Sequence, residues 1–588
     1  MVRYDVNEET GNPGYLGEVL GALKSAGQSG IAVSIIAAAD VDGLCSAKIV
    51  SNLLRRESVR YELTIVNRQS ELQERLQSLS SESESRPAVL LNCGAPIDLS
   101  LYSPRIFVFD SHRPIHHNNL KAPGVLVLDD DIDAETPEFD EDEGGSPAES
   151  EDGPSEKEFD SSNEMANPRK KKQNRNTSFG SKRQKTDEPS SYSLHHYYRG
   201  SYYATPTALL LYQLALAAQQ QTEDSLWLAC VALAGYHEAG WYPSSQYFAV
   251  AHDIDTKYLP EWSRITGKKQ LRLQEELRLS LMRHQPLISA ISNSFYFFGK
   301  LELNRDHGKR VLQQLLAYAG LPPVEYNQLH ASMSLAARQK LKGKSFVDAC
   351  RSFGLEDVTG FEFSRSTRLG DEEAPSVMVG DMTAADLAAA IVASASEPIL
   401  TGTAADVRKG IQTALDWCKI VSAQAKLVID RRASKIKDGV RFIRIERSLS
   451  AAFSSTPALI RQLGVFLAGV YKNKYTSIDA HKKLPIILAV KNANRYVCVG
   501  VDCENQRNEF QARYRQAERF SGVTVEYDNL DPAVVEVGVS DFDKWAQALF
   551  GLKSSDGLEG DFDTEEEEEV GEDSGTKLVE DIPEFAMA

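Results

Sequence analysis

The chain has 588 residues, 42% of them hydrophobic and 25% charged, with a net charge of −19. This length favours about three or four domains of ordinary globular composition, and the acidity argues against a protein that coats duplex DNA by charge alone. Neither a signal peptide nor a run of ~20 apolar residues is visible, so we expect neither secretion nor a membrane partner. The seven cysteines have no CxxC spacing, which indicates a reducing compartment and no zinc site.

Residues 30–50 read as a strand, an acidic turn and a helix. An apolar, β-branched run over 31–36 is followed by Asp40 and Asp42, and apolar residues then recur at helical spacing. Two carboxylates at the carboxyl end of a buried parallel strand could hold a divalent cation. The alternative is that Asp42 caps the helix and Asp40 is solvated in the turn.

Four more strands are expected, at 61–67, 88–92, 106–110 and 124–128, with a helix over 71–79 between the first two. Each of these strands has an acidic, amide or glycine residue at or near its end. The pattern predicts a doubly wound parallel sheet with polar side chains gathered along one rim. We call this set the rim; its expected members are Asp40, Asp42, Asn92, Asp110, His112 and the acidic residues 129–131.

Residues 133–191 contain an acidic run, a Ser/Glu/Pro tract and two basic clusters with few large apolar residues. Such a composition cannot offset its ordering entropy by burial, so we expect a disordered insert. The basic clusters resemble a bipartite nuclear-import signal, which predicts a nuclear protein; a solvated charge run is the alternative. The signal would comprise Arg169, Lys170, Lys171, Lys172, Lys182, Arg183 and Lys185.

Beyond the insert, Thr205 is expected to cap a helix that has Pro206 at its first position, and a second helix is expected over 224–236. The segment 254–395 reads as mainly helical, including 271–284 and 306–319, and suggests a docking module. A long helix over 410–429 then precedes strands at 441–446, 484–490, 495–502, 523–528 and 534–539. The tail after Ser554 is acidic and expected to be disordered.

The predicted class is therefore α/β, with a parallel-sheet domain, a helical middle module and a second, smaller α/β domain. The expected domains are 1–132 with 192–250, the insert 133–191, the helical module 251–398, the closing α/β domain 399–553 and the tail 554–588. A basic run could contact the phosphates of single-stranded DNA, with a solvated hairpin around 437–439 as the alternative. Its residues are Arg431, Arg432, Lys435, Lys437, Arg441, Arg444 and Arg447.

Several segments carry a family resemblance. AADVDGLCSAKI, LLNCGAPIDL, FDSHRPIHHNN and VLDDD, followed by YYRGSYYATPTALLLYQLA, HGKRVLQQLLAYAGLP and LPIILAVKNANRYVCVGVD, resemble the cell-division-cycle forty-five family. These eukaryotic replication factors are related to the RecJ exonuclease within the DHH phosphoesterases. The resemblance implies a DHH-like first domain and a DHHA1-like closing domain.

The catalytic relatives hold two metal ions with aspartates and histidines, and this chain departs from their pattern. Ala38 and Ile36 stand where an aspartate and a histidine are expected, Asn92 replaces an aspartate, and Ser111 replaces a histidine. Gly235 and His237 are nearest the expected place of the last acidic ligand. The closing domain also lacks the Gly-rich, Arg-containing substrate loop. The resemblance thus implies a relic rim without catalysis, metal or cofactor.

The same resemblance implies a function and partners. The protein would be a non-catalytic subunit of the replicative helicase, joining the minichromosome-maintenance hexamer to the GINS complex. Origin-firing loading factors and DNA polymerase epsilon are further expected partners, and single-stranded DNA a further ligand. The alternative is a metal-dependent, RecJ-like exonuclease acting on single-stranded nucleic acid.

Overall fold

A computed structural model describes residues 2–3, 14–82, 86–130, 197–198, 200–266, 271–365, 382–394, 404–473 and 481–551. The contacts divide the chain into two units, Met1–Asp130 with Gly200–Ala588, and Asp131–Arg199. The expected insert 133–191 with its import signal and the expected acidic tail 554–588 lie outside the described residues. No helix within the described ranges combines the length and apolarity that crossing a bilayer requires.

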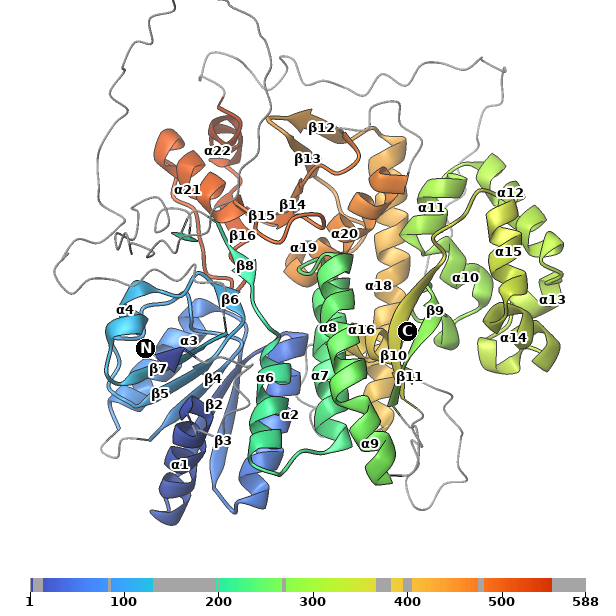
Figure 1. Ribbon diagram of the computed structural model, residues 1–588. Coiled ribbons are helices and arrows are strands. Elements are labelled where there is room, and N and C mark those ends of the chain that lie inside the picture. Colours follow the sequence, from blue (N-terminus) through green and yellow to red (C-terminus); the bar gives the residue numbers. More distant parts are fainter. Residues whose placement is uncertain are drawn as a thin grey trace, which may run out of the picture. The chain divides into compact units, whose positions relative to one another are not determined.

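The N-terminal part of the first unit is built on a six-stranded sheet, in the order β1-β7-β5-β4-β2-β3. All neighbouring strands are parallel, which confirms the predicted parallel sheet (Figure 1). Because parallel strands end at a common edge, the residues that follow them meet there. The strands are β1 (Val2–Arg3), β2 (Val33–Ala38), β3 (Tyr61–Val66), β4 (Ala88–Leu91), β5 (Ile106–Phe109) and β7 (Val125–Asp129).

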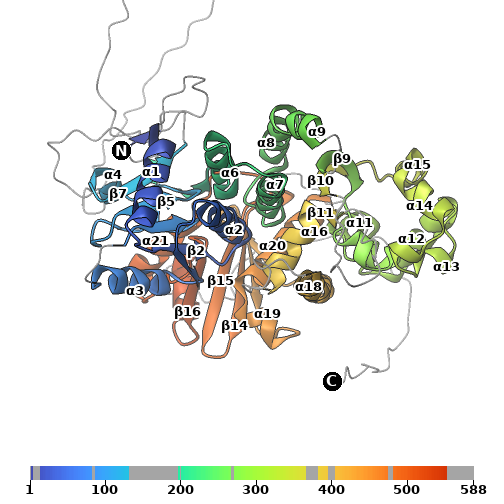
Figure 2. The same ribbon diagram turned by 90° about the horizontal axis from the view of Figure 1, so that it is seen from below.

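Both faces of this sheet are covered, as expected of a doubly wound fold. Along β2, Val33 and Ile35 belong to one apolar core and Ile36 to another, since successive strand residues point to opposite faces. In Figure 2, α1 and α3 lie on opposite sides of the sheet. The first face packs against α1 (Gly14–Gln28), α2 (Val41–Arg56), α6 (Thr207–Ala217) and α7 (Glu223–Glu238), and the second against α3 (Gln69–Ser80) and α4 (His117–Lys121).

The C-terminal part of the first unit, for which we keep the name closing domain, contains a mixed five-stranded sheet in the order β12-β13-β14-β15-β16. Four of the five predicted strands are confirmed, but 523–528 is not a strand and makes only an isolated bridge from Glu526 to Glu536. Val523 and Val525 are buried in the same core as α21 (Phe510–Ser521), and the chain then continues as a loop. The strands are β12 (Ser434–Lys437), β13 (Val440–Ile445), β14 (Ile486–Asn492), β15 (Arg495–Val501) and β16 (Val534–Gly538).

Helices cover both faces of the closing sheet as well. Ile443 and Leu488 pack into one core with α18 and α20, whereas Phe442 and Ile487 pack into another with α21 and α22. The long helix expected over 410–429 is confirmed as α18. The helices are α18 (Ala404–Asp430), α19 (Ala451–Ser455), α20 (Pro457–Asn473), α21 (Phe510–Ser521) and α22 (Phe542–Leu549).

The middle segment contains a small antiparallel sheet that the sequence reading missed. Residues 271–284, expected as a helix, form β9 (Leu271–Leu277) followed by a loop and a 3₁₀ turn. Strand β9 pairs with β10 (Thr359–Arg365), which pairs with β11 (Met382–Thr383). The helical prediction for this stretch is wrong because tertiary pairing with a distant segment, which buries Leu271 and half-buries Leu273, overrides its helix-forming Glu, Gln and Leu content.

The remaining middle segment is helical, as expected, and the helix over 306–319 is confirmed as α12. Its apolar residues Leu312, Leu315 and Leu316 are buried in the same core as the closing sheet and α20. The helices are α8 (Ser244–Lys257), α9 (Leu259–Thr266), α10 (Leu287–Ser292), α11 (Phe295–Leu301), α12 (Asp306–Tyr318), α13 (Pro323–Tyr326), α14 (Leu335–Lys342), α15 (Lys344–Ser352) and α16 (Ala384–Ser394).

Candidate functional site at the rim of the parallel sheet

The turn after β2 brings the first two rim carboxylates to the edge of the sheet. Asp40 is the N-cap of α2, and its Oδ1 accepts the Gly43 backbone N–H at 2.7 Å. The Cβ of any residue other than glycine at position 43 would collide with the Ala38 carbonyl oxygen. The expectation that Asp42 caps this helix is therefore wrong: Asp40 does so, from a half-buried position.

Asp42 instead caps a different helix. Its side chain is fully buried and accepts the backbone N–H groups of Thr207, at 2.7 Å, and Ala208, at 2.8 Å. These are the first two residues of α6, whose N-cap Pro206 offers no side-chain acceptor. The prediction that Thr205 caps this helix is therefore wrong, because the buried carboxylate of Asp42, distant in sequence, accepts the first N–H groups of α6. Burial, followed by the charge of Asp40, raises the pKa of Asp42 to about 7.

Asn92 stands where the chain leaves β4 and joins three rim segments. Its φ of +53° lies in the left-handed region, which asparagine tolerates better than most residues. The side-chain Nδ2 donates to Asp40 Oδ2 at 2.9 Å, and Oδ1 accepts from Ser111 Oγ at 2.8 Å. The amide therefore acts as donor to one rim residue and acceptor for another, a role that a carboxylate could not fill.

Asp110 and His112 form a buried pair at the end of β5. The His112 Nδ1 lies 2.7 Å from Asp110 Oδ1, and the other oxygen of Asp110 accepts the Ala95 N–H at 2.8 Å. Burial alone would raise the pKa of Asp110, but His112 and the hydrogen bonds lower it overall. Burial likewise opposes protonation of His112, yet Asp110 outweighs it and raises the pKa of His112 to about 8.

A residue that the sequence reading missed completes the rim. The Tyr236 hydroxyl, on α7, donates to Asp42 Oδ2 at 2.8 Å, and its oxygen also lies in close contact with Ser111 Oγ. The two residues that the resemblance placed at this position, Gly235 and His237, do not reach the rim side chains. Gly235 packs against Val41, and the His237 ring stacks on Tyr247. The family resemblance pointed to an acidic ligand in this region and not to a tyrosine. The one signal for Tyr236 in the sequence was its helical spacing from the apolar residues of the helix expected over 224–236.

The acidic residues after β7 serve a separate contact. Asp130 lies 2.7 Å from the buried guanidinium of Arg113 and accepts the Thr205 N–H at 2.9 Å. Asp129 lies 3.7 Å from the same guanidinium, and position 131 is outside the described residues. Along the described parts of the chain, no group of three or more His, Cys, Asp or Glu side chains is arranged to hold a metal ion.

A cleft of about 530 Å³ opens beside the rim, a volume in the range of ligand sites. Its walls include Asp40, His112 and Glu238, together with residues of α16, α18, α20 and the loop 526–531. The two arginines in its lining are paired with carboxylates of the closing domain, Arg68 with Asp528 and Arg461 with Asp531.

The same loop ties the closing domain to the N-terminal domain. The Asp528 carbonyl accepts the Gln69 N–H at 2.8 Å, and its carboxylate accepts the Ser70 N–H at 2.8 Å. A second tie exchanges two backbone hydrogen bonds, of 2.8 and 2.9 Å, between Ser201 and Asn508. The two α/β domains are therefore joined by hydrogen bonds at two places.

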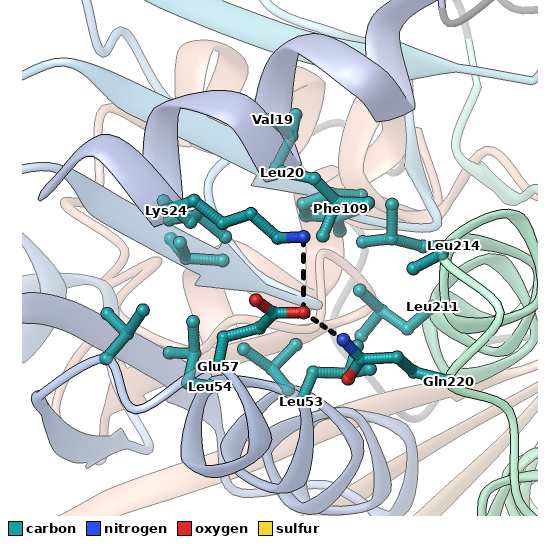
Figure 3. Close-up of a pocket in the computed structure, with 15 residues that line it drawn as sticks. Val19, Leu20, Lys24, Leu53, Leu54, Glu57, Phe109, Leu211, Leu214 and Gln220 are labelled. Atoms are coloured by element: carbon teal, nitrogen blue, oxygen red, sulfur yellow. Dashed lines mark hydrogen bonds and ion pairs between the residues drawn. The ribbon is translucent and has the colours of Figure 1, made fainter. Parts of the chain in front are cut away.

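A second cavity, between α1, α2 and α6, is shown in Figure 3. It encloses about 20 Å³, roughly room for one water molecule. The charged residues in its lining are Lys24 and Glu57, which form an ion pair at 3.2 Å, and Gln220 donates to the same carboxylate. This cavity is a gap in packing and offers no chemistry.

The basic run proposed for DNA contact is divided between surface and interior. Asp438 and Gly439 both have positive φ and form the turn between β12 and β13. Arg441 is buried over the ring of Tyr471, and the Arg444 guanidinium pairs with Asp543 at 2.6 Å. Arg431 and Arg432 are exposed, whereas Lys435 and Lys437 are half-buried. DNA contact by this run stays a prediction.

Comparison with known proteins finds relatives that match most of the chain. The chain is 23% identical over 620 residues to the cell division control protein 45 homolog of Schizosaccharomyces pombe, covering 90% of this chain and 97% of that protein. It is 22% identical over 571 residues to the human protein of the same name, covering 89% and 97%. The crystal structure of CDC45 from Entamoeba histolytica has the same fold, with a TM-score of 0.62 and 18% identity over 91% of this chain and 98% of that one.

The family model of CDC45 matches residues 33–141, 132–393 and 389–551. These ranges include the rim, the middle segment and the closing domain, and so extend over nearly all the described residues. The family expected from the sequence motifs is therefore confirmed: this chain belongs to the CDC45 family.

Proposed function

We propose that this protein is a non-catalytic scaffold of the nuclear DNA-replication machinery, which joins the minichromosome-maintenance hexamer to the GINS complex. Membership of the CDC45 family supports a role in DNA replication and the cell cycle. Origin-firing loading factors and DNA polymerase epsilon belong to the same proposal.

The observation that carries the non-catalytic part is the use of the rim oxygens. Both oxygens of Asp40, Asp42 and Asp110 accept hydrogen bonds from protein donors. A two-metal site needs carboxylate oxygens directed at the cations. Here the amide of Asn92 and the hydroxyl of Tyr236 direct hydrogens to those oxygens. The residues present therefore do not fit a pair of metal ions, and no hydrolytic step follows from them.

The ties between the two α/β domains support the same proposal. Many enzymes open and close around their substrate, whereas here backbone hydrogen bonds at Gln69 and Ser201 join the two α/β domains. The two arginines of the cleft already neutralise Asp528 and Asp531, which leaves less positive charge for a phosphate chain. The RecJ-like exonuclease is thus the weaker candidate, and binding of single-stranded DNA remains a separate question for the exposed Arg431 and Arg432.

The exposed part of the middle segment is the surface we propose for partner docking, because the rim residues are committed to internal hydrogen bonds. Affinity purification of tagged protein from S-phase nuclei tests this. We expect the helicase ring and GINS to co-purify with wild-type protein, and Asp110→Asn to retain them. The double change Lys342→Glu and Lys344→Glu should reduce recovery at least fivefold, and Arg519→Glu, on α21, is the matched surface control.

If Asp110→Asn loses the partners while the Lys342 and Lys344 variant keeps them, the rim is the docking surface and the assignment to the middle segment is wrong. If wild-type protein recovers neither the ring nor GINS, the scaffold proposal itself fails.

A further inference from the structure

The helices α12 to α15 expose an unusual combination of side chains. Eight large hydrophobic residues of the described part are strongly exposed, and four of them lie between positions 318 and 335. Water-exposed apolar side chains grouped in this way mark interaction surfaces more often than isolated ones do. The four are Tyr318, with 68% of its surface exposed, Val324, with 78%, Leu329, with 47%, and Leu335, with 65%.

The same helices are basic in an acidic protein. Residues 306–352, which comprise α12 to α15, contain seven lysines and arginines against three acidic residues, whereas the whole chain carries a net charge of −19. All three carboxylates are already used: Asp306 pairs with Lys309, Asp348 pairs with Arg351, and Glu325 accepts the Ser334 N–H at 3.0 Å. The basic residues are Lys309, Arg310, Arg338, Lys340, Lys342, Lys344 and Arg351.

Local contacts bring the apolar and basic residues together. The Lys340 Nζ on α14 donates to the carbonyl of Gly320, two residues beyond Tyr318. The hydrogen bond between Glu325 and Ser334 joins α13, which carries Val324, to the start of α14 at Leu335. Burial, followed by the charges of Arg283, Arg338 and Lys342, lowers the pKa of the intervening His330 to about 4. We call this region the basic-apolar face.

The chain itself contains a segment of complementary composition. Residues 552–588 carry fourteen acidic residues against two lysines, with five consecutive glutamates at 565–569 and apolar residues such as Phe562, Ile582 and Phe585. Thirty-seven residues can extend over about 120 Å, which exceeds the ~60 Å expected across a compact unit of this size. Charge and reach therefore both permit contact with α12 to α15.

We propose that the acidic C-terminal segment, residues 552–588, docks on the basic-apolar face of α12 to α15 within the same molecule. Its glutamates pair with Lys340, Lys342 and Lys344, and its apolar residues cover Tyr318 and Leu335. The segment thereby occupies part of the surface proposed above for partner docking, so a partner that binds there must displace it. This inference does not depend on which proteins the scaffold joins.

Zero-length carbodiimide cross-linking of the full-length monomer tests the docking. The reagent joins a carboxylate to a lysine amine only when the two are in contact, and mass spectrometry identifies the pair. We expect cross-links from Glu565–Glu569 to Lys340, Lys342 or Lys344 at low salt, unchanged on tenfold dilution and lost in 1 M NaCl, where the Debye length is ~3 Å.

The change Leu335→Ser should reduce these cross-links at least threefold, whereas Phe520→Ser, at an equally exposed residue of α21, should leave them unchanged. Thermal melts of both variants verify that they remain folded. The proposal is overturned if the glutamates link equally to lysines outside α12 to α15, or if the links disappear on dilution.

Discussion

Replacing Asp42 by alanine tests the role that the structure gives to the rim carboxylates. The buried side chain caps α6 through Thr207 and Ala208 and accepts the hydroxyl of Tyr236. Three buried hydrogen bonds at ~1 kcal/mol each give a loss of about 3 kcal/mol in the free energy of unfolding. Asp40 is a half-buried N-cap, so Asp40→Ala should cost only about 1 kcal/mol.

The cost of the Asp42 substitution should also depend on pH. The folded protein raises the pKa of Asp42 to about 7, above the ~3.9 of an unfolded aspartate. The folded state therefore holds this proton more tightly, and the resulting stability is complete below pH ~3.9 and is lost as the pH rises through about 7. Between pH 5 and pH 8 the wild type should lose roughly 2.5 kcal/mol through Asp42, whereas Asp42→Ala should not.

Urea unfolding followed by tryptophan fluorescence at pH 5 and pH 8 measures both effects. We expect Asp42→Ala to be the more destabilising change at pH 5 and its cost to fall below ~1 kcal/mol at pH 8. An Asp40→Ala cost that equals or exceeds that of Asp42→Ala at pH 5 would refute the capping assignment. If the loss of unfolding free energy caused by Asp42→Ala is the same at both pH values, the pKa of Asp42 is not raised by burial as we infer.

Four further changes have definite expected outcomes. Because the pKa of His112 is raised to about 8, its stabilisation is complete below pH ~6.5 and is lost as the pH rises through 8, so His112→Gln should remove about 2 kcal/mol of pH dependence from urea melts. Gly235→Ala places a Cβ 2.9 Å from Val41 and should lower stability by about 1–3 kcal/mol, whereas Gly21→Ala, in open space on α1, should raise it by ~0.5–1 kcal/mol. Deleting residues 135–189 should change the free energy of unfolding by only about 1 kcal/mol and reduce nuclear accumulation in microscopy; a deletion protein that still concentrates in nuclei would disprove the import signal.

The parallel sheet could be predicted from the sequence because its strands are buried on both faces. Runs such as 88–92 and 106–110 are continuously apolar and end in polar residues, a pattern with few alternatives. Strand β9 could not be predicted, because the spacing of Leu271 and Leu273 is compatible with a helix as well as with a strand. Pairing with β10, more than 80 residues away, makes this segment a strand. The strand prediction for 523–528 was wrong although the segment has a strand-like composition. Its valines are buried, but they belong to a loop and do not pair as a strand.

The rim shows the same limit at the level of single residues. Its location and most of its members followed from motif order, but their roles did not. Asp42 caps a helix that begins 165 residues later, and no local pattern reveals such a contact. Tyr236 was overlooked because the resemblance directed attention to acidic ligands, whereas the structure places a phenol hydroxyl beside Asp42 and Ser111.

The central claim is that the rim oxygens serve folding and not hydrolysis. The most direct test measures degradation of 5′-labelled single-stranded DNA by the purified full-length protein in excess manganese, beside Asp40→Asn and a chelator control. The account predicts that the wild type degrades DNA no faster than Asp40→Asn or the chelated sample. A manganese-dependent rate in the wild type that Asp40→Asn abolishes would contradict it and restore the exonuclease.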